Sequence, residues 1–108
     1  MTGPLVFNYE PFTLNLVSTN AYLNGVKLPL TQKEFSLLLG FIKNPGEIIS
    51  AENILTSFWE VPVNSDFTIL KAQVSNLRKK LHESNSGYTI KAVRHRGYCF
   101  QLVESQFE

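Results

Sequence analysis

The feature that most constrains the fold is a basic amphipathic segment followed directly by an alternating one, between residues 67 and 103. Apolar residues recur in the first part at helical spacing, at Leu70, Val74, Leu77 and Leu81. Such spacing places them on one stripe of an α-helix, predicted over roughly residues 67–82. The sequence "NSG" at 85–87 ends that helix. The runs "YTIKAV" and "YCFQLV" then flank "RHRG", which predicts a hairpin with charged residues at its tip.

The first part of the chain is expected to form a small antiparallel sheet. Phe12, Leu14 and Leu16 alternate with polar residues in the run "FTLNLV", and the preceding run "LVFNY" is also rich in β-forming residues. Asn24-Gly25 stands between two apolar pairs, and this dipeptide is the strongest short-range signal for a two-residue hairpin. These patterns predict strands within residues 1–30.

Two more helices are expected between this sheet and the basic helix. Thr31 and Glu34 have capping-box spacing, and an apolar stripe follows at Phe35, Leu38, Leu39 and Ile42. The sequence "NPG" at 44–46 ends this helix. Ser50 can cap a second, shorter helix with an apolar face of Ile54, Leu55, Phe58 and Trp59, and Trp59 is predicted to be part of the core. A connector, Glu60–Asp66, leads to the third helix, which Ser65 or Asp66 can cap.

Positive charge is concentrated in one part of this 108-residue chain, whose formal net charge is only +1. Residues 71–96 hold seven Lys and Arg against one Glu, a sum of +6, whereas residues 1–70 sum to −3 and residues 97–108 to −2. This asymmetry indicates a surface for a polyanion. A basic helix that is merely solvated would have the same composition. The placement of the side chains on the helix therefore has to distinguish a binding surface from a solvated one.

The face of the third helix opposite its apolar stripe carries small and amide side chains as well as lysine. At about 100° per residue, the residues opposite the stripe are Thr68, Ala72, Asn76 and Lys79, and the flanks hold Lys71, Gln73 and Lys80. Amides can pair with an adenine edge, and a small apolar group can touch a thymine methyl. Lys and Arg nearer the C-terminal end can bind phosphates. This pattern is typical of a helix that lies in the DNA major groove.

The order of the elements favours nucleic acid over a plain solvated surface. Three helices, the last of them basic, followed by a hairpin with Arg94 and Arg96 at its tip, describe a winged helix. An arginine at such a tip can enter a narrow minor groove, where the negative potential is strongest. The residues predicted to contact DNA are Thr68, Lys71, Ala72, Gln73, Asn76, Arg78, Lys79, Lys80, Arg94 and Arg96.

These motifs together resemble the winged-helix effector domain of OmpR/PhoB-type response regulators. The stretches that carry the resemblance are "LTQKEFSLLLGFIKNPGEIISAENILTSFW" (30–59), "VSNLRKKL" (74–81) and "AVRHRGYCF" (92–100). The resemblance implies an α+β fold, a winged helix-turn-helix with an N-terminal four-stranded antiparallel sheet. The expected parts of a single domain, 1–108, are the sheet (1–30), a three-helix core (31–82) and a C-terminal β-hairpin wing (88–103).

The resemblance also implies sequence-specific binding of double-stranded DNA for transcription regulation, usually as a tandem pair on direct repeats. It implies that Arg78 lies near the DNA backbone, and that the loop Glu60–Asp66 can contact RNA polymerase. No receiver domain with a phosphorylatable aspartate is present in these residues. We therefore expect the effector domain of a two-component regulator or, alternatively, the cytoplasmic domain of a ToxR-like regulator that lacks a receiver.

The sequence departs from the family pattern at three positions. Gln73 and Asn76 stand where His or Arg is common in relatives, and His95 stands where glycine usually follows the wing arginine. These differences prevent transfer of a target DNA sequence from relatives. They do not alter the expected mode of binding.

Other function classes find little support in the sequence. His82, His95 and the single cysteine, Cys99, have no obvious catalytic partners, and no zinc spacing or phosphate loop is present, so we expect neither an enzyme nor a cofactor or metal site. There is no long apolar run or signal peptide, which indicates a cytoplasmic segment without membrane contact. A winged helix used only for protein contacts would need an exposed apolar patch in place of the polar face.

Overall fold

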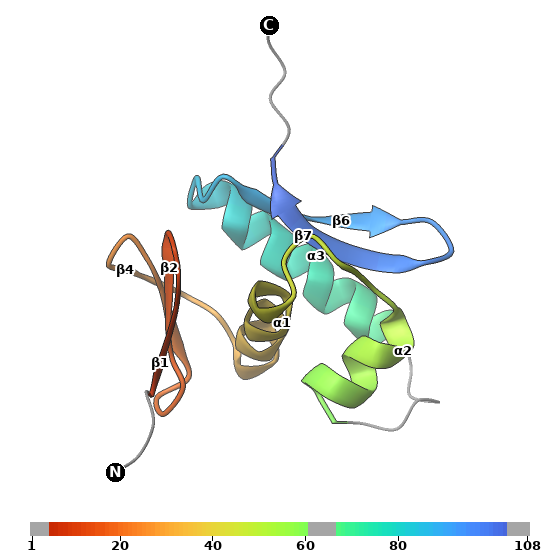
Figure 1. Cartoon of the computed structure of the whole chain (residues 1–108), viewed down its shortest axis with the longest axis horizontal. Helices are drawn as coiled ribbons and strands as arrows, with labels where there is room; N and C mark the ends of the chain where they lie inside the picture. Colours follow the sequence, from red (N-terminus) through yellow and green to blue (C-terminus); the bar gives the residue numbers. More distant parts are fainter. Residues whose placement is uncertain (1–4, 61–66, 104–108) are drawn as a thin grey trace, which may run out of the picture.

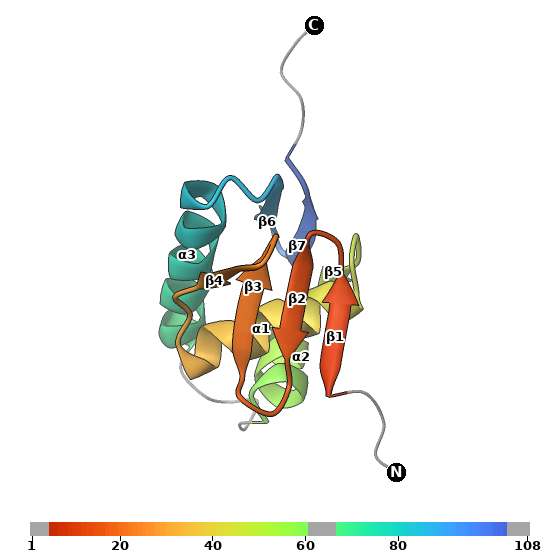
Figure 2. The same ribbon diagram turned by 90° about the vertical axis from the view of Figure 1, so that its left-hand side faces the viewer.

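A four-stranded antiparallel sheet opens the chain in the computed structural model, which describes residues 5–60 and 67–103 (Figure 1). The strands pair in chain order and are β1 (Val6–Tyr9), β2 (Phe12–Asn15), β3 (Asn20–Leu23) and β4 (Val26–Leu28). The alternation of the sequence decides which face is covered, since Phe12 and Leu14 are buried while Thr13 and Asn15, which alternate with them, are partly exposed. Figure 2 shows the sheet lying in front of helix α1 (Gln32–Lys43).

The hairpin between β3 and β4 is the predicted one. Leu23 pairs with Val26, so Asn24 and Gly25 form a two-residue turn. Their φ angles are 52° and 84°, and a turn of this kind requires positive φ at both positions.

Helix α1 begins with the expected capping box. The Thr31 hydroxyl accepts a hydrogen bond from the Glu34 backbone N–H (3.2 Å), and the Glu34 carboxylate accepts one from the Thr31 N–H (2.9 Å). The buried face of α1 is wider than the predicted stripe, because Leu37 and Phe41 are also fully buried, whereas Leu39 is only partly covered. Both the sheet and the other helices pack on α1 (Figure 1), so a helix in this position buries more than one stripe.

The second helix differs from the prediction in its winding. Ser50 caps it as expected, its hydroxyl accepting from the Asn53 N–H (3.1 Å). Only Ala51–Asn53 (α2) is α-helical, and Ile54–Phe58 (η1) continues as a π-helix. Gly40 of α1 leaves the room that the Phe58 ring occupies, since a Cβ on this glycine would lie 2.6 Å from the ring.

Trp59 lies at the edge of the core, not inside it as predicted. Its side chain is partly buried and packs against the core cluster. The indole N–H donates to the Lys33 carbonyl (3.1 Å), and the Lys33 ammonium lies 4.5 Å from the ring centroid. An indole that finds its partners at the surface in this way need not be fully buried.

The third helix and the hairpin follow the predicted order. Helix α3 (Phe67–Glu83) is succeeded by β6 (Tyr88–Val93) and β7 (Gly97–Leu102). A short strand that the sequence did not reveal, β5 (Ile48–Ile49), pairs with β7 and completes a three-stranded sheet. The predicted loop Glu60–Asp66 and the caps Ser65 and Asp66 lie outside the described residues, apart from Glu60.

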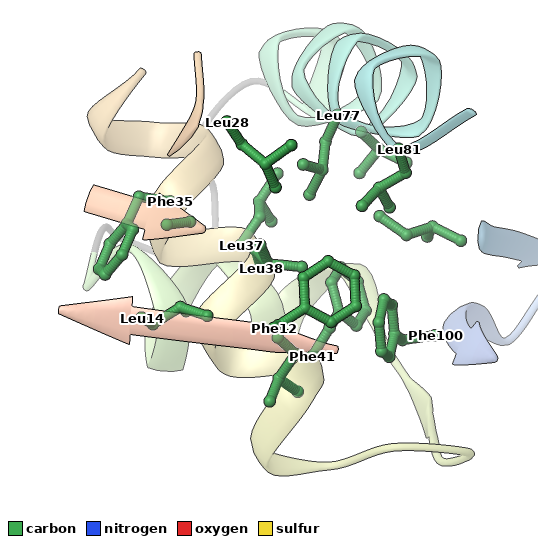
Figure 3. Packing of buried hydrophobic residues seen from close by; sticks show 14 of the residues in the cluster. Phe12, Leu14, Leu28, Phe35, Leu37, Leu38, Phe41, Leu77, Leu81 and Phe100 are labelled. Atoms are coloured by element: carbon green, nitrogen blue, oxygen red, sulfur yellow. The ribbon is translucent and has the colours of Figure 1, made fainter. Parts of the chain in front are cut away.

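One apolar core joins the N-terminal sheet, the helices and the hairpin (Figure 3). Phe100 of β7 is fully buried; its ring stacks on Tyr88 at 4.9 Å between centroids and lies 6.0 Å from Phe12 of β2. Burial and the adjacent Tyr9 raise the pKa of Tyr88 above its ordinary value. Within the described residues, no helix is long and apolar enough to cross a membrane.

Candidate nucleic-acid interface

The orientation of α3 is fixed by its buried seam. This seam is the apolar stripe predicted from the sequence. Its four residues are each at most 1% exposed, and they are Leu70, Val74, Leu77 and Leu81. Figure 3 shows Leu77 and Leu81 pointing from α3 into the core. Because one face is held inward, the opposite face must point to solvent.

The structure divides the predicted helix contacts into two groups. The exposed ones are Thr68, Lys71, Ala72, Asn76 and Lys79. The partly buried ones are Gln73, Arg78 and Lys80. The side chains of the exposed group point to solvent. Those of the partly buried group are covered in part by the rest of the domain.

Arg78 ties α3 to the hairpin. Its Nε–H donates to the Ile90 carbonyl of β6 over 2.7 Å. This bond sets the spacing between the helix and the wing, so Arg78 positions the two elements in addition to any contact with DNA.

Lys80 is directed toward α1. Its ammonium donates to the Glu34 carboxylate (2.6 Å) and to the Pro29 carbonyl (2.7 Å). Glu34 is 2% exposed, and the same carboxylate closes the capping box of α1. Lys80 is among the residues predicted to bind phosphates because it lies near the C-terminal end of the helix; in the structure its flank position directs its ammonium to the buried Glu34 carboxylate.

This ion pair leads to a prediction about stability. Lys80→Ala should lower the free energy of unfolding by about 2–3 kcal/mol, because it leaves a buried carboxylate without its cation. Lys79→Ala, one residue away on the exposed face, should change it by less than about 0.5 kcal/mol. Urea denaturation of both variants is the measurement, and equal losses would contradict the assignment.

Gln73 lies on the flank of α3 and is half-buried. No donor among the described residues reaches its Oε1, which is buried. Its amide is therefore less accessible than that of Asn76, which is exposed three residues later on the outward face.

The wing presents two arginines at its tip. Val93 pairs with Gly97, which leaves Arg94, His95 and Arg96 as an exposed three-residue loop. His95 adopts a φ of 65° and Gly97 one of 141°. Within residues 5–60 and 67–103, neither arginine makes an ion pair, so both cations are available to a ligand.

A groove of about 480 Å³ runs between α3 and the wing. Lys71 and Arg78 line it together with Ser75 and Tyr98. Sequence reasoning did not single out Ser75 or Tyr98. Ser75 lies one turn after Lys71 on the same flank of α3, and the position of Tyr98 next to α3 depends on how the hairpin packs, which no local pattern reveals.

The residues considered for catalysis lie in separate structural settings. His82 shares a hydrogen bond with the Thr89 hydroxyl (3.0 Å), His95 is at the wing tip, and Cys99 is buried in β7. No cluster of three or more metal-binding side chains occurs among the residues that the structure describes.

The domain combines three features: a helix with an outward polar and basic face, a neighbouring hairpin with arginines at its tip, and an N-terminal antiparallel sheet. Together they define a winged helix of the OmpR/PhoB effector type. The profile of the family described as "Transcriptional regulatory protein, C terminal" matches residues 25–100, which are 76 of the 108 residues. The chain belongs to this family, and it is thus a transcription-regulator domain.

Relatives and solved structures agree with this assignment. The transcriptional regulatory protein CusR of Escherichia coli K12 is 29% identical over 100 residues, which are 93% of this chain and 44% of CusR. The chain thus spans less than half the length of this curated relative. The DNA-binding domain of Klebsiella pneumoniae RstA, solved with its RstA box, is 26% identical with a TM-score of 0.72 and covers 89% of this chain and 96% of its own. The DNA-binding domain of E. coli CpxR is 27% identical with a TM-score of 0.74, covering 94% and 100%.

Proposed function

We propose that this chain binds double-stranded DNA sequence-specifically, as the effector domain of a cytoplasmic two-component response regulator. Helix α3 lies in the major groove and the wing tip reaches an adjacent minor groove. The observation that carries the proposal is the exposed face of α3, where Ala72, Asn76 and Lys79 point outward opposite a fully buried seam. This face combines an amide and a small apolar group that can meet base edges with a cation that can meet a phosphate.

Two finer features are part of the proposal. The domain binds direct repeats as a tandem pair, and the loop Glu60–Asp66 contacts RNA polymerase. A winged helix used only for protein contacts is less favoured, because the outward face of α3 is mainly polar and basic. A regulator of the ToxR-like type, in which the winged helix precedes a transmembrane segment, is also less favoured, since the matching family is described as a C-terminal domain.

Asn76→Ala tests base reading. The variant should lose about 1–3 kcal/mol of binding free energy on a site selected from random DNA and little on a scrambled duplex. Lys79→Ala should weaken binding to both duplexes alike and reduce the salt slope by about one, because phosphates are the same in every sequence. Titrations on both duplexes at several salt concentrations measure this. Equal losses for Asn76→Ala on both would show that this residue does not read bases.

Arg94→Ala tests the wing. Losing a charge-assisted contact in a narrow groove should weaken binding by roughly 1–2 kcal/mol, while the free energy of unfolding changes by less than about 0.5 kcal/mol because the side chain is exposed. Lys27→Ala is a matched control, since it removes one exposed cation from the N-terminal sheet. If both variants bind equally well, the wing tip does not contact DNA.

A further inference from the structure

Ile69 is a large apolar side chain on the first turns of α3, and it is 52% exposed. It is not among the residues predicted to contact DNA. It belongs neither to the buried seam nor to the core cluster. A single exposed isoleucine is common on protein surfaces, so its neighbours on the helix determine whether it has a function.

These neighbours are the residues proposed to read bases. Ala72 and Asn76 follow Ile69 by three and seven positions, which places the three side chains on one stripe of the helix. All three are exposed. Phe67, the other exposed apolar residue of α3 at 41%, is two residues earlier and therefore projects about 200° away. Ile69 alone among the large apolar residues of α3 shares the face with Asn76.

An apolar side chain has one partner on the base edges of the major groove. This partner is the C5-methyl group of thymine, because the other groups displayed there are hydrogen-bond donors and acceptors. We propose that Ile69 packs against a thymine methyl and thereby selects an A·T pair within the site that Asn76 also reads. The inference rests on the proposed function and makes Ile69 a specificity-determining residue.

Deoxyuridine provides the test, because it lacks only the methyl group and keeps the hydrogen-bonding pattern of thymine. Each thymine of the selected site is replaced in turn, and the affinity of the whole chain for each duplex is measured. At one position the unmodified chain should bind about fourfold more weakly, the factor expected for burial of one methyl group. Ile69→Ala should bind the all-thymine site about fourfold more weakly and be indifferent to deoxyuridine at that same position.

Val26→Ala is the matched control, since Val26 is a 69% exposed β-branched residue of the N-terminal sheet. It should keep the full sensitivity to deoxyuridine. The inference is overturned if no single replacement weakens binding by the unmodified chain, or if Ile69→Ala retains the same sensitivity at every position. Asn76→Ala tests the proposed function separately. If this variant loses affinity for the selected site but not for the scrambled duplex, the proposed function stands even though the inference about Ile69 fails. If the chain selects no site at all, both the function and this inference fail.

Discussion

Gly97→Ala should lower the free energy of unfolding by about 3–5 kcal/mol. A Cβ at this position would lie 2.0 Å from the Ile49 carbonyl oxygen and 2.8 Å from the Ser50 Cα. Both are backbone atoms, at the point where β5 ends and α2 is capped, so no side chain can rotate away. Relief of the clash requires β7 to separate from β5, and an alanine at a φ of 141° is strained as well.

Gly25→Ala separates the two contributions. This glycine also has a positive φ, 84°, but no atom lies within 4 Å of a Cβ built on it. Its substitution should therefore cost only the backbone strain, about 1–2 kcal/mol. Urea denaturation followed by the fluorescence of Trp59, which is partly buried, measures both variants. If Gly97→Ala lowers the free energy of unfolding no more than Gly25→Ala does, the wing has room to shift away from the clash.

The elements that sequence reasoning predicted well are those set by local periodicity and by turn chemistry. The seam from Leu70 to Leu81 and the hairpin at Asn24-Gly25 both depend on residues a few positions apart. The same holds for the cap at Thr31. In each case the physical cause lies within one helix or one turn, so a pattern in the sequence is sufficient to predict it.

The features that the sequence did not reveal depend on contacts between distant segments. Strand β5 has two residues and exists because β7 pairs with it. The π-helical winding of Ile54–Phe58 accompanies the packing of Phe58 on Gly40, a residue of another helix. No local pattern encodes either contact.

The same reason explains the limits of the site prediction. The helical wheel placed Lys80 on a flank, among the expected phosphate contacts, but it could not show that Glu34, which lies 46 positions earlier in the chain, engages its ammonium. The same wheel places Ile69 beside Asn76, away from the apolar stripe, but a large apolar side chain was not counted among the expected DNA contacts. The structure shows that this side chain is 52% exposed.

The second large effect is expected at Phe100, one of the residues through which the wing meets the N-terminal sheet. Its side chain is fully buried, and its ring lies against Tyr88 of β6, Phe12 of β2 and Tyr9 of β1. Its backbone carbonyl also accepts a hydrogen bond from the Gly46 N–H (2.9 Å), after the end of α1. Phe100→Ala should lower the free energy of unfolding by about 3–5 kcal/mol, because it removes aromatic packing and leaves a cavity between the two sheets.

Leu102→Ala is the control on the same strand, since this leucine is 62% exposed and its truncation should cost less than about 0.5 kcal/mol. A double-mutant cycle of Phe100→Leu with Phe12→Leu then measures the coupling between the wing and the N-terminal sheet. Because the two rings are neighbours at 6.0 Å, the losses should deviate from additivity by at least about 0.5 kcal/mol. Additive losses would mean that Phe100 and Phe12 stabilise the domain independently, and that other contacts, such as those of Tyr88 with Tyr9 and Phe12, join the wing to the N-terminal sheet.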